Sequence, residues 1–166
     1  MSIQKIAATV LAAGSLAAIP LVASATNGDG GVVTYRVTIE NVATGTQPMS
    51  PGGVVIHGAD VDVWSAGSPA SAAVAAVAED ANLPVYVETY SAVPGVKNAF
   101  VGGGAPFGPT EDVMFEFDAK RNDRISVVSM LVNTNDAFTG LDSIRLGNET
   151  QVFDVGAYDA GTEVNT

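Results

Sequence analysis

The chain has 166 residues, no cysteine, one histidine and a formal net charge of −11 at pH 7. This length suits a single domain with a hydrophobic core of its own. The absence of cysteine excludes disulfides, thiol nucleophiles and zinc sites built from cysteine. The acidic balance disfavours nucleic acid and acidic membranes as partners, and it favours cations.

Residues 1–25 have the layout of a secretory signal peptide. Lys5 precedes the apolar run 6–22, and a small-residue cleavage motif ends at Ala25. A retained membrane anchor is the alternative, but Pro20 interrupts the run, which is shorter than the roughly 20 residues that a spanning helix needs. We therefore expect cleavage after Ala25, no transmembrane segment in the mature chain, and a secreted protein located outside the cell, in the periplasm or in the cell envelope.

The mature chain is predicted to begin with a flexible leader at 26–31, followed by one domain at 32–166. The domain opens with VVTYRVTIENV, in which apolar and polar residues alternate. This period of two is typical of a half-buried strand. The residues expected on its buried face are Val33, Tyr35, Val37 and Ile39. A loop rich in proline and glycine follows at 43–53, and 54–64 returns to the composition of a strand.

One helix is predicted next, over 69–81. Ser68 is a suitable N-cap, Pro69 suits the first helical position, and nearly all residues up to Ala81 favour a helix. The stretch 83–90 is expected to be a strand or an extended segment, since Pro84 argues against the middle of a sheet.

The C-terminal half of the chain reads as further strands. An alternating strand is predicted at 113–119, a polar turn at 120–124, and a strand buried on both faces at 125–132. Two short strands are predicted at 141–146 and 150–155. The fold class is thus mostly β, an antiparallel β-sandwich with one short helical insertion.

Catalysis by a serine–histidine–aspartate set would have to use His57, the single histidine. It lies in VVIHGAD, and the chain carries no nucleophile-elbow motif. A histidine at the end of a strand, with its ring bonded to the backbone, is the simpler interpretation. We therefore predict no enzymatic activity, and a hydrolase that uses His57 stays as a remote alternative.

Carboxylates near the C-terminus are the candidate metal ligands. Asp136 and Asp142 flank AFTGL, and Asp159 and Glu163 flank AGT. Calcium takes six to eight oxygen ligands, which loops rich in aspartate, asparagine and glycine provide. The spacing does not match the 12-residue calcium loop of helix–loop–helix proteins. An ordinary turn is the alternative at each segment.

Two of these segments resemble the spondin N-terminal domain family, in its secreted prokaryotic form. They are SMLVNTNDAFTGLDSI at 129–144 and YDAGTEVN at 158–165. The stretch VWSAGSPASAAVAAVAEDA at 63–81 resembles the helix region of that family, and 35–58 resembles its first strands. The resemblance runs from Tyr35 to the C-terminus. It implies a sandwich similar to C2 domains, with a calcium ion bound by loop carboxylates at one end.

Carried over by position, the resemblance implies that Asp136, Asp159 and Glu163 are the calcium ligands, and Asp142 is an outer candidate. Glu163 stands where animal members have aspartate. Ala137 replaces a tryptophan of the animal motif, so that Phe138 remains as the local aromatic. Asn133 and Asn135 are expected to hold the loop. Relatives usually continue beyond this motif, so we also expect a missing last strand and an open sheet edge.

These observations favour a secreted, non-catalytic, calcium-binding module for adhesion or ligand binding. Animal relatives in the family are matrix and adhesion proteins, so the expected partner is a cell-surface protein or carbohydrate and not nucleic acid. The alternative is an acidic structural protein of the envelope or the extracellular space in a saline habitat, with no specific role for calcium. Calcium-specific stabilisation would distinguish the two.

Overall fold

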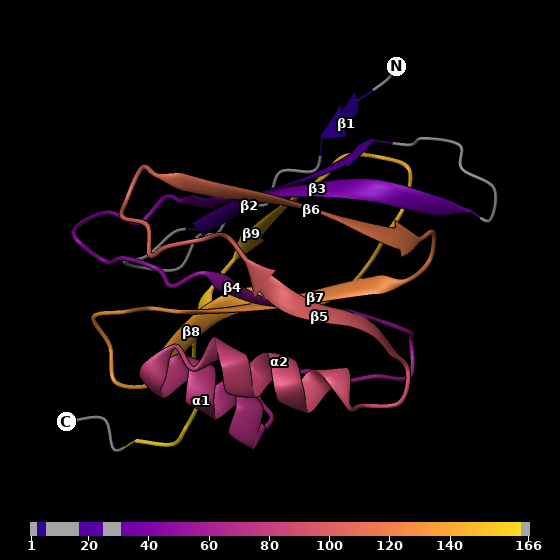
Figure 1. Cartoon of the computed structure of the whole chain (residues 1–166). Helices are drawn as coiled ribbons and strands as arrows, with labels where there is room; N and C mark the ends of the chain where they lie inside the picture. The colour runs from indigo at the N-terminus through magenta and orange to yellow at the C-terminus, as the bar shows by residue number, and fades with distance from the viewer. Residues whose placement is uncertain (1–2, 6–16, 25–30, 164–166) are drawn as a thin grey trace.

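The computed structural model describes residues 3–5, 17–24 and 31–163. Two antiparallel sheets face each other, and two helices cover the outer side of one of them (Figure 1). The first sheet has the order β1-β2-β3-β6, with β9 paired to β2, and the second has the order β10-β8-β7-β4-β5. The predicted antiparallel β-sandwich is confirmed.

The first sheet contains β1 (Ile3–Lys5), β2 (Ala17–Ser24), β3 (Val32–Asn41), β6 (Asp112–Lys120) and β9 (Gln151–Val155). The predicted alternation of β3 is confirmed, because Tyr35, Val37 and Ile39 are fully buried. The predicted strands at 113–119 and 150–155 are confirmed as β6 and β9.

The N-terminal part of the first sheet comes from the predicted signal peptide. β2 pairs antiparallel with β3 on one side and with β9 on the other. The predicted cleavage site after Ala25 lies outside the described residues, as does the predicted leader at 26–31 apart from Gly31. In the part of the chain that the structure describes, no helix is long and apolar enough to cross a membrane.

The second sheet contains β4 (Gly52–His57), β5 (Val96–Gly102), β7 (Arg124–Met130), β8 (Ala137–Arg145) and β10 (Ala157–Asp159). One core lies between the sheets, and a second lies between this sheet and the helices. Val127 belongs to the first core and Val128 to the second. The expected burial of this strand on both faces is therefore confirmed.

The first helix, α1 (Ala72–Asp80), starts later than predicted. Its N-cap is Ser71, whose hydroxyl accepts a hydrogen bond from the Val74 N–H at 3.2 Å. The predicted N-cap, Ser68, instead closes a turn by donating its N–H to the Ser65 carbonyl. The helix ends at Asp80, and its C-cap, Ala81, has a left-handed conformation with φ of 51°.

The prediction of a strand or extended segment at 83–90 is wrong, because this stretch forms a second helix, α2 (Leu83–Ser91). Asn82 caps it by accepting the Val85 N–H, and Pro84 lies in the first turn, where no intrahelical donor is required. The buried residues Leu83, Tyr86 and Tyr90 are three and four positions apart, which is the period of a helix face packed on a sheet.

The structure also corrects the limits of several strands. β4 ends at His57, so 58–64 is irregular and not strand. β5 was not predicted, and β8 begins at Ala137, within the segment read as a loop. Short β10 pairs with the start of β8, which brings Asp159 opposite Ala137. This pairing joins the two segments that carry the predicted metal ligands.

Candidate functional site

The loop between β7 and β8 is held by short-range hydrogen bonds. The Thr134 hydroxyl donates to the Leu131 carbonyl at 2.6 Å and accepts from the Ala137 N–H at 3.2 Å. The Asn133 side chain donates to the Thr46 carbonyl at 2.9 Å, which ties the loop to the connection between β3 and β4. Asn133 thus holds the loop, as predicted.

Asp136, at the end of this loop, is buried with 3% of its surface exposed. Its Oδ2 accepts the backbone N–H groups of Thr162 and Glu163, both at 3.0 Å. Oδ2 also accepts the Thr162 hydroxyl at 3.3 Å, and the Asp136 carbonyl accepts the Ala160 N–H at 3.0 Å. One side chain therefore fixes the segment that follows β10.

Asp159 and Glu163 lie on that same segment and are exposed. The Asp159 Oδ1 accepts the Gly161 N–H at 2.6 Å, which closes a tight turn. Glu163 reaches Asp136 through its backbone N–H. Within the described residues, no group of three acidic or histidine side chains converges as a metal site would require. The structure thus places the three predicted ligands on two adjacent segments without clustering their carboxylates.

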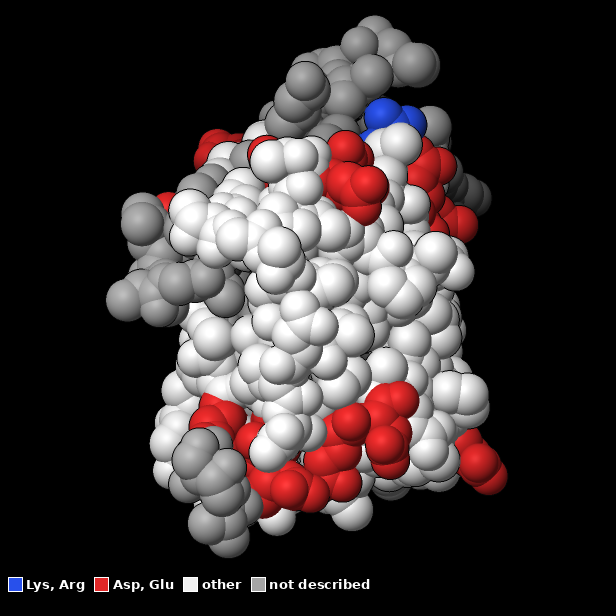
Figure 2. Space-filling view, turned by 90° about the vertical axis from the view of Figure 1, so that its left-hand side faces the viewer, with Lys and Arg blue, Asp and Glu red and all other residues white. Residues whose placement is uncertain are grey.

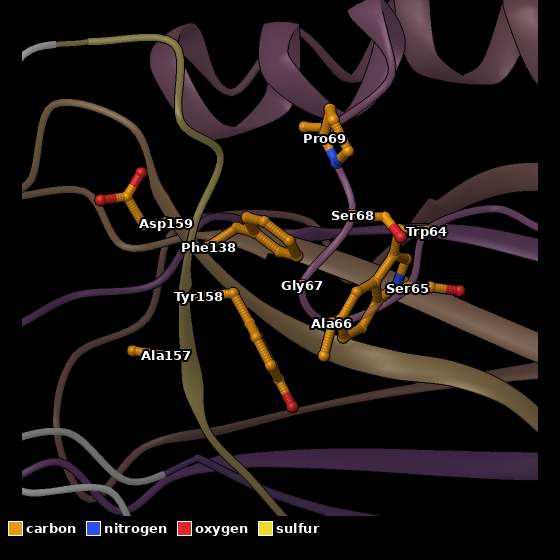
Figure 3. A pocket seen from close by; sticks show the side chains of 11 residues that line it. Trp64, Ser65, Ala66, Gly67, Ser68, Pro69, Phe138, Ala157, Tyr158 and Asp159 are labelled. Carbon is orange, nitrogen blue, oxygen red and sulfur yellow. The ribbon is translucent and has the colours of Figure 1, made fainter.

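An aromatic pocket adjoins this acidic loop. A cavity of about 260 Å³ lies between β10 and the segment Trp64–Ala70, and Asp159 is at its rim. Figure 3 shows the rings of Trp64, Phe138 and Tyr158 facing one another, while the Asp159 carboxylate points away from them. The ring centroids of Trp64 and Tyr158 are 4.7 Å apart, and those of Trp64 and Phe138 are 5.2 Å apart.

Phe138, the aromatic that remains in this motif, is not available at the surface. Its side chain is 4% exposed, because it packs edge to face against Trp64 in the core beneath the helices. Tyr158 is only half-buried and presents the accessible ring of the pocket. Sequence reasoning missed Trp64 and Tyr158, although Trp64 is the single tryptophan and Tyr158 opens the YDAGTE motif.

A second cavity, of about 220 Å³, is also lined by Trp64 and Tyr158. Asp142 lines it too, together with residues of β9. The Asp142 Oδ1 is buried and has no hydrogen-bond partner among the described groups. Asp142, the outer candidate for calcium, therefore faces this cavity and does not join Asp136.

Charge is unevenly distributed over the surface. Figure 2 shows acidic side chains gathered at both ends of one face, with a largely uncharged band between them. The lower group lies on the side of the helices and near the end of the described chain. Such a surface concentrates cations at this end of the domain.

His57 is fully buried between neighbouring strands. Its Nδ1 lies 2.8 Å from the Gly58 carbonyl, which can only accept, so Nδ1 carries the proton. Its Nε2 then accepts the Ser126 hydroxyl at 2.9 Å. Ser126 is fully buried too, so no substrate reaches this pair. The simpler interpretation of His57, as a histidine bonded to the backbone at a strand end, agrees with this geometry.

Acidification is expected to destabilise the protein through His57. Burial lowers the pKa of His57, and the nearby charge of Arg124 lowers it further. The unfolded chain therefore binds a proton first as the pH falls below about 6.5, and stability decreases over that interval. Between pH 7.5 and 5.5, the unfolding temperature should fall more steeply for the native chain than for His57→Gln. Equal slopes would contradict a buried neutral histidine.

Comparison with known proteins gives one family. A family model described as Spondin_N matches residues 49–166. No curated protein sequence matches the chain. The matched region includes β4, both helices, the Asp136 loop and the aromatic pocket. The chain therefore belongs to the spondin N-terminal domain family, a family of extracellular modules that are not catalytic.

Proposed function

We propose that the protein is a secreted, calcium-dependent module for adhesion or ligand binding, with its ligand site at the Trp64–Tyr158 pocket. The observation that carries this proposal is that the pocket adjoins the two segments that carry Asp136, Asp159 and Glu163. Asp159 belongs to both, because it lines the pocket and closes the turn that precedes Thr162. A cation bound to the loop would therefore also fix the wall of the pocket.

The donor chemistry of the loop suits calcium. Asp136, Asp159 and Glu163 supply carboxylate oxygens, and hard oxygen ligands are what calcium prefers. The segment after β10 already folds onto Asp136, and Glu163 is exposed beside it. These three residues would hold the ion, and the ion would cross-link the β7–β8 loop to the segment after β10.

The pocket suits a ligand with both apolar and polar faces. The Tyr158 ring offers a stacking surface, and Ser65 and Ser68 add polar groups at the rim. Sugar rings have an apolar face and a hydroxyl edge, and a tyrosine side chain likewise combines an apolar ring with a hydroxyl group. A cell-surface carbohydrate or protein is therefore the partner class that we propose.

Calcium is expected to raise the unfolding temperature by several degrees at a concentration ten times the dissociation constant. The comparison is calcium against chelator at matched ionic strength, with Asp159→Ala as the test variant. Asp60→Ala removes the same charge from an exposed turn and serves as the control.

Asp60→Ala should keep the calcium response, and Asp159→Ala should lose it. Equal stabilisation by sodium and calcium would instead favour the second candidate, a structural protein adapted to salt. The acidic surface in Figure 2 is the observation that keeps this candidate open.

A further inference from the structure

β2 occupies a gap between two strands that do not pair with each other. It pairs with β3 through positions such as Leu21–Val37, and with β9 through positions such as Ile19–Phe153. β2 is the strand through which β9 joins the described first sheet. Without β2, β3 would therefore have a free edge, and β9 would have no strand neighbour in that sheet. We call this gap the strand slot.

The strand slot lies over the core between the two sheets. Tyr35, Val37 and Ile39 of β3 are fully buried there, and Val155 and Phe153 of β9 pack on the same core. Emptying the slot would leave backbone N–H and C=O groups of two strands unpaired and would expose part of this core. A vacant slot of this kind strongly favours the binding of a strand.

The sequence predicts that the segment which fills the slot leaves with the signal peptide, since β2 lies entirely within residues 1–25. We propose that the strand slot of the secreted chain is a binding site for a β-strand donated by another polypeptide. The donated strand would run antiparallel to both β3 and β9, as β2 does.

The register defines the chemistry of the donated strand. Directly opposed residues of antiparallel strands share one face of the sheet. Positions opposite Tyr35 and Val37 therefore lie on the core side and require apolar residues, whereas the position opposite Arg36 lies on the outer side. The matching ligand is an extended segment of about eight residues, which is the length of β2. It should have an apolar residue at every second position, because alternate side chains of a strand face the same side of the sheet.

Charge favours a segment of a different protein over a second copy of this chain. The formal net charge is −11, so two copies brought edge to edge would repel each other. The described strands of 31–163 already have partners within the fold, and using one of them for exchange would dismantle a sheet. An uncharged or basic strand from another protein would not be repelled, and its binding would not require a described strand to leave its sheet.

The test starts from the folded full chain. A specific protease site is introduced between Ala25 and Gly31, and the purified protein is cut there, so that β2 becomes a separate peptide in its slot. A fluorescent peptide of residues 17–24 is then added. We expect it to replace the cut segment and to bind one per chain, whereas the same peptide with Leu21→Asp, which places a charge opposite Val37, should bind at least tenfold more weakly.

Covalent trapping locates the peptide. The chain has no cysteine, so Arg36→Cys provides a single thiol on β3, directly opposite the position of Val22. With oxidised glutathione as the oxidant, a peptide with Val22→Cys should form a disulfide with it, since opposed residues lie within disulfide distance. Lys97→Cys on β5 in the other sheet is the matched control and should remain uncoupled.

Each result decides the proposal. Exchange of the peptide with selective coupling to Arg36→Cys supports the strand slot. Release of the cut segment without peptide binding, at an unchanged unfolding temperature, would overturn it, because the slot would then not need a strand. Self-association of the cut protein would also overturn it, in favour of a second copy as occupant. If the cut protein unfolds, recovery of the folded state on adding the peptide supports the proposal, and failure to recover rejects it.

Discussion

Replacing Asp136 by alanine is expected to lower the free energy of unfolding by about 2–3 kcal/mol, even when no calcium is present. The carboxylate accepts two backbone N–H groups and one hydroxyl from Thr162 and Glu163. Hydrogen bonds to a charged acceptor are stronger than neutral ones. Alanine leaves these donors without a partner, so the segment after β10 is expected to detach from the β7–β8 loop.

The measurement is chemical unfolding of Asp136→Ala beside Asp159→Ala and Asp60→Ala. Each variant removes one negative charge, so differences among them report position and not net charge. Asp136 is buried, whereas Asp159 and Asp60 are exposed. In chelator, we expect a large loss only for Asp136→Ala. In calcium, the free energy of unfolding of Asp159→Ala should also be lower than that of Asp60→Ala. Equal losses for all three in chelator would contradict the role of Asp136 as the anchor of this segment.

The strands were predictable wherever one face is buried and the other exposed. β3 and β6 show this alternation in the sequence, and the structure confirms both. The continuous apolar run of β7 was also informative, because cores lie on both of its faces. β5 was missed because its exposure does not follow a period of two, as a strand at the edge of a sheet can show.

α2 was not predicted because a proline is compatible with two different local structures. Pro84 argues against a central strand, but it also fits the first turn of a helix. The spacing of Leu83, Tyr86 and Tyr90 indicated the helix, and it was the better signal. Ser68 competed with Ser71 as N-cap, and local composition could not separate two serines three residues apart.

The candidate site was predictable in part. The two motifs that contain Asp136 and Asp159 pointed to neighbouring segments, and the pairing of β8 with β10 brings them together. The pocket was not predictable from local sequence, because Trp64 and Tyr158 are far apart along the chain and meet only through tertiary packing. The burial of Phe138 could not be predicted for the same reason, since it packs against Trp64.

Replacing Gly140 by alanine is expected to destabilise the protein by about 3 kcal/mol or more, through overpacking against backbone that has no room to move. A Cβ at Gly140 would lie 1.9 Å from the Val127 carbonyl oxygen and 3.3 Å from the Val128 Cα. These atoms belong to the neighbouring strand β7. Relief therefore requires β7 and β8 to separate.

The reason for this close approach is a bulge in β8. Ile125 pairs with Ile144, but Val127 pairs with Leu141, so β8 has one extra residue between these pairs. Ser143 takes a left-handed conformation with φ of 52°, and its N–H donates to the Ser126 hydroxyl at 2.9 Å. The motif GLDS is thus a structural irregularity built from specific backbone contacts.

This irregularity also positions the pocket. The Leu141 carbonyl accepts the Trp64 Nε1–H at 3.2 Å, so displacement of β8 would move the ring that packs against Tyr158. Trp64 is the single tryptophan, and its fluorescence therefore reports the pocket directly. Gly140→Ala should lower the midpoint of denaturant unfolding and shift the native emission. Gly104→Ala is the matched control, because a Cβ there meets no atom within 4 Å. Equal effects of the two alanines would contradict the steric role of the close approach between Gly140 and Val127.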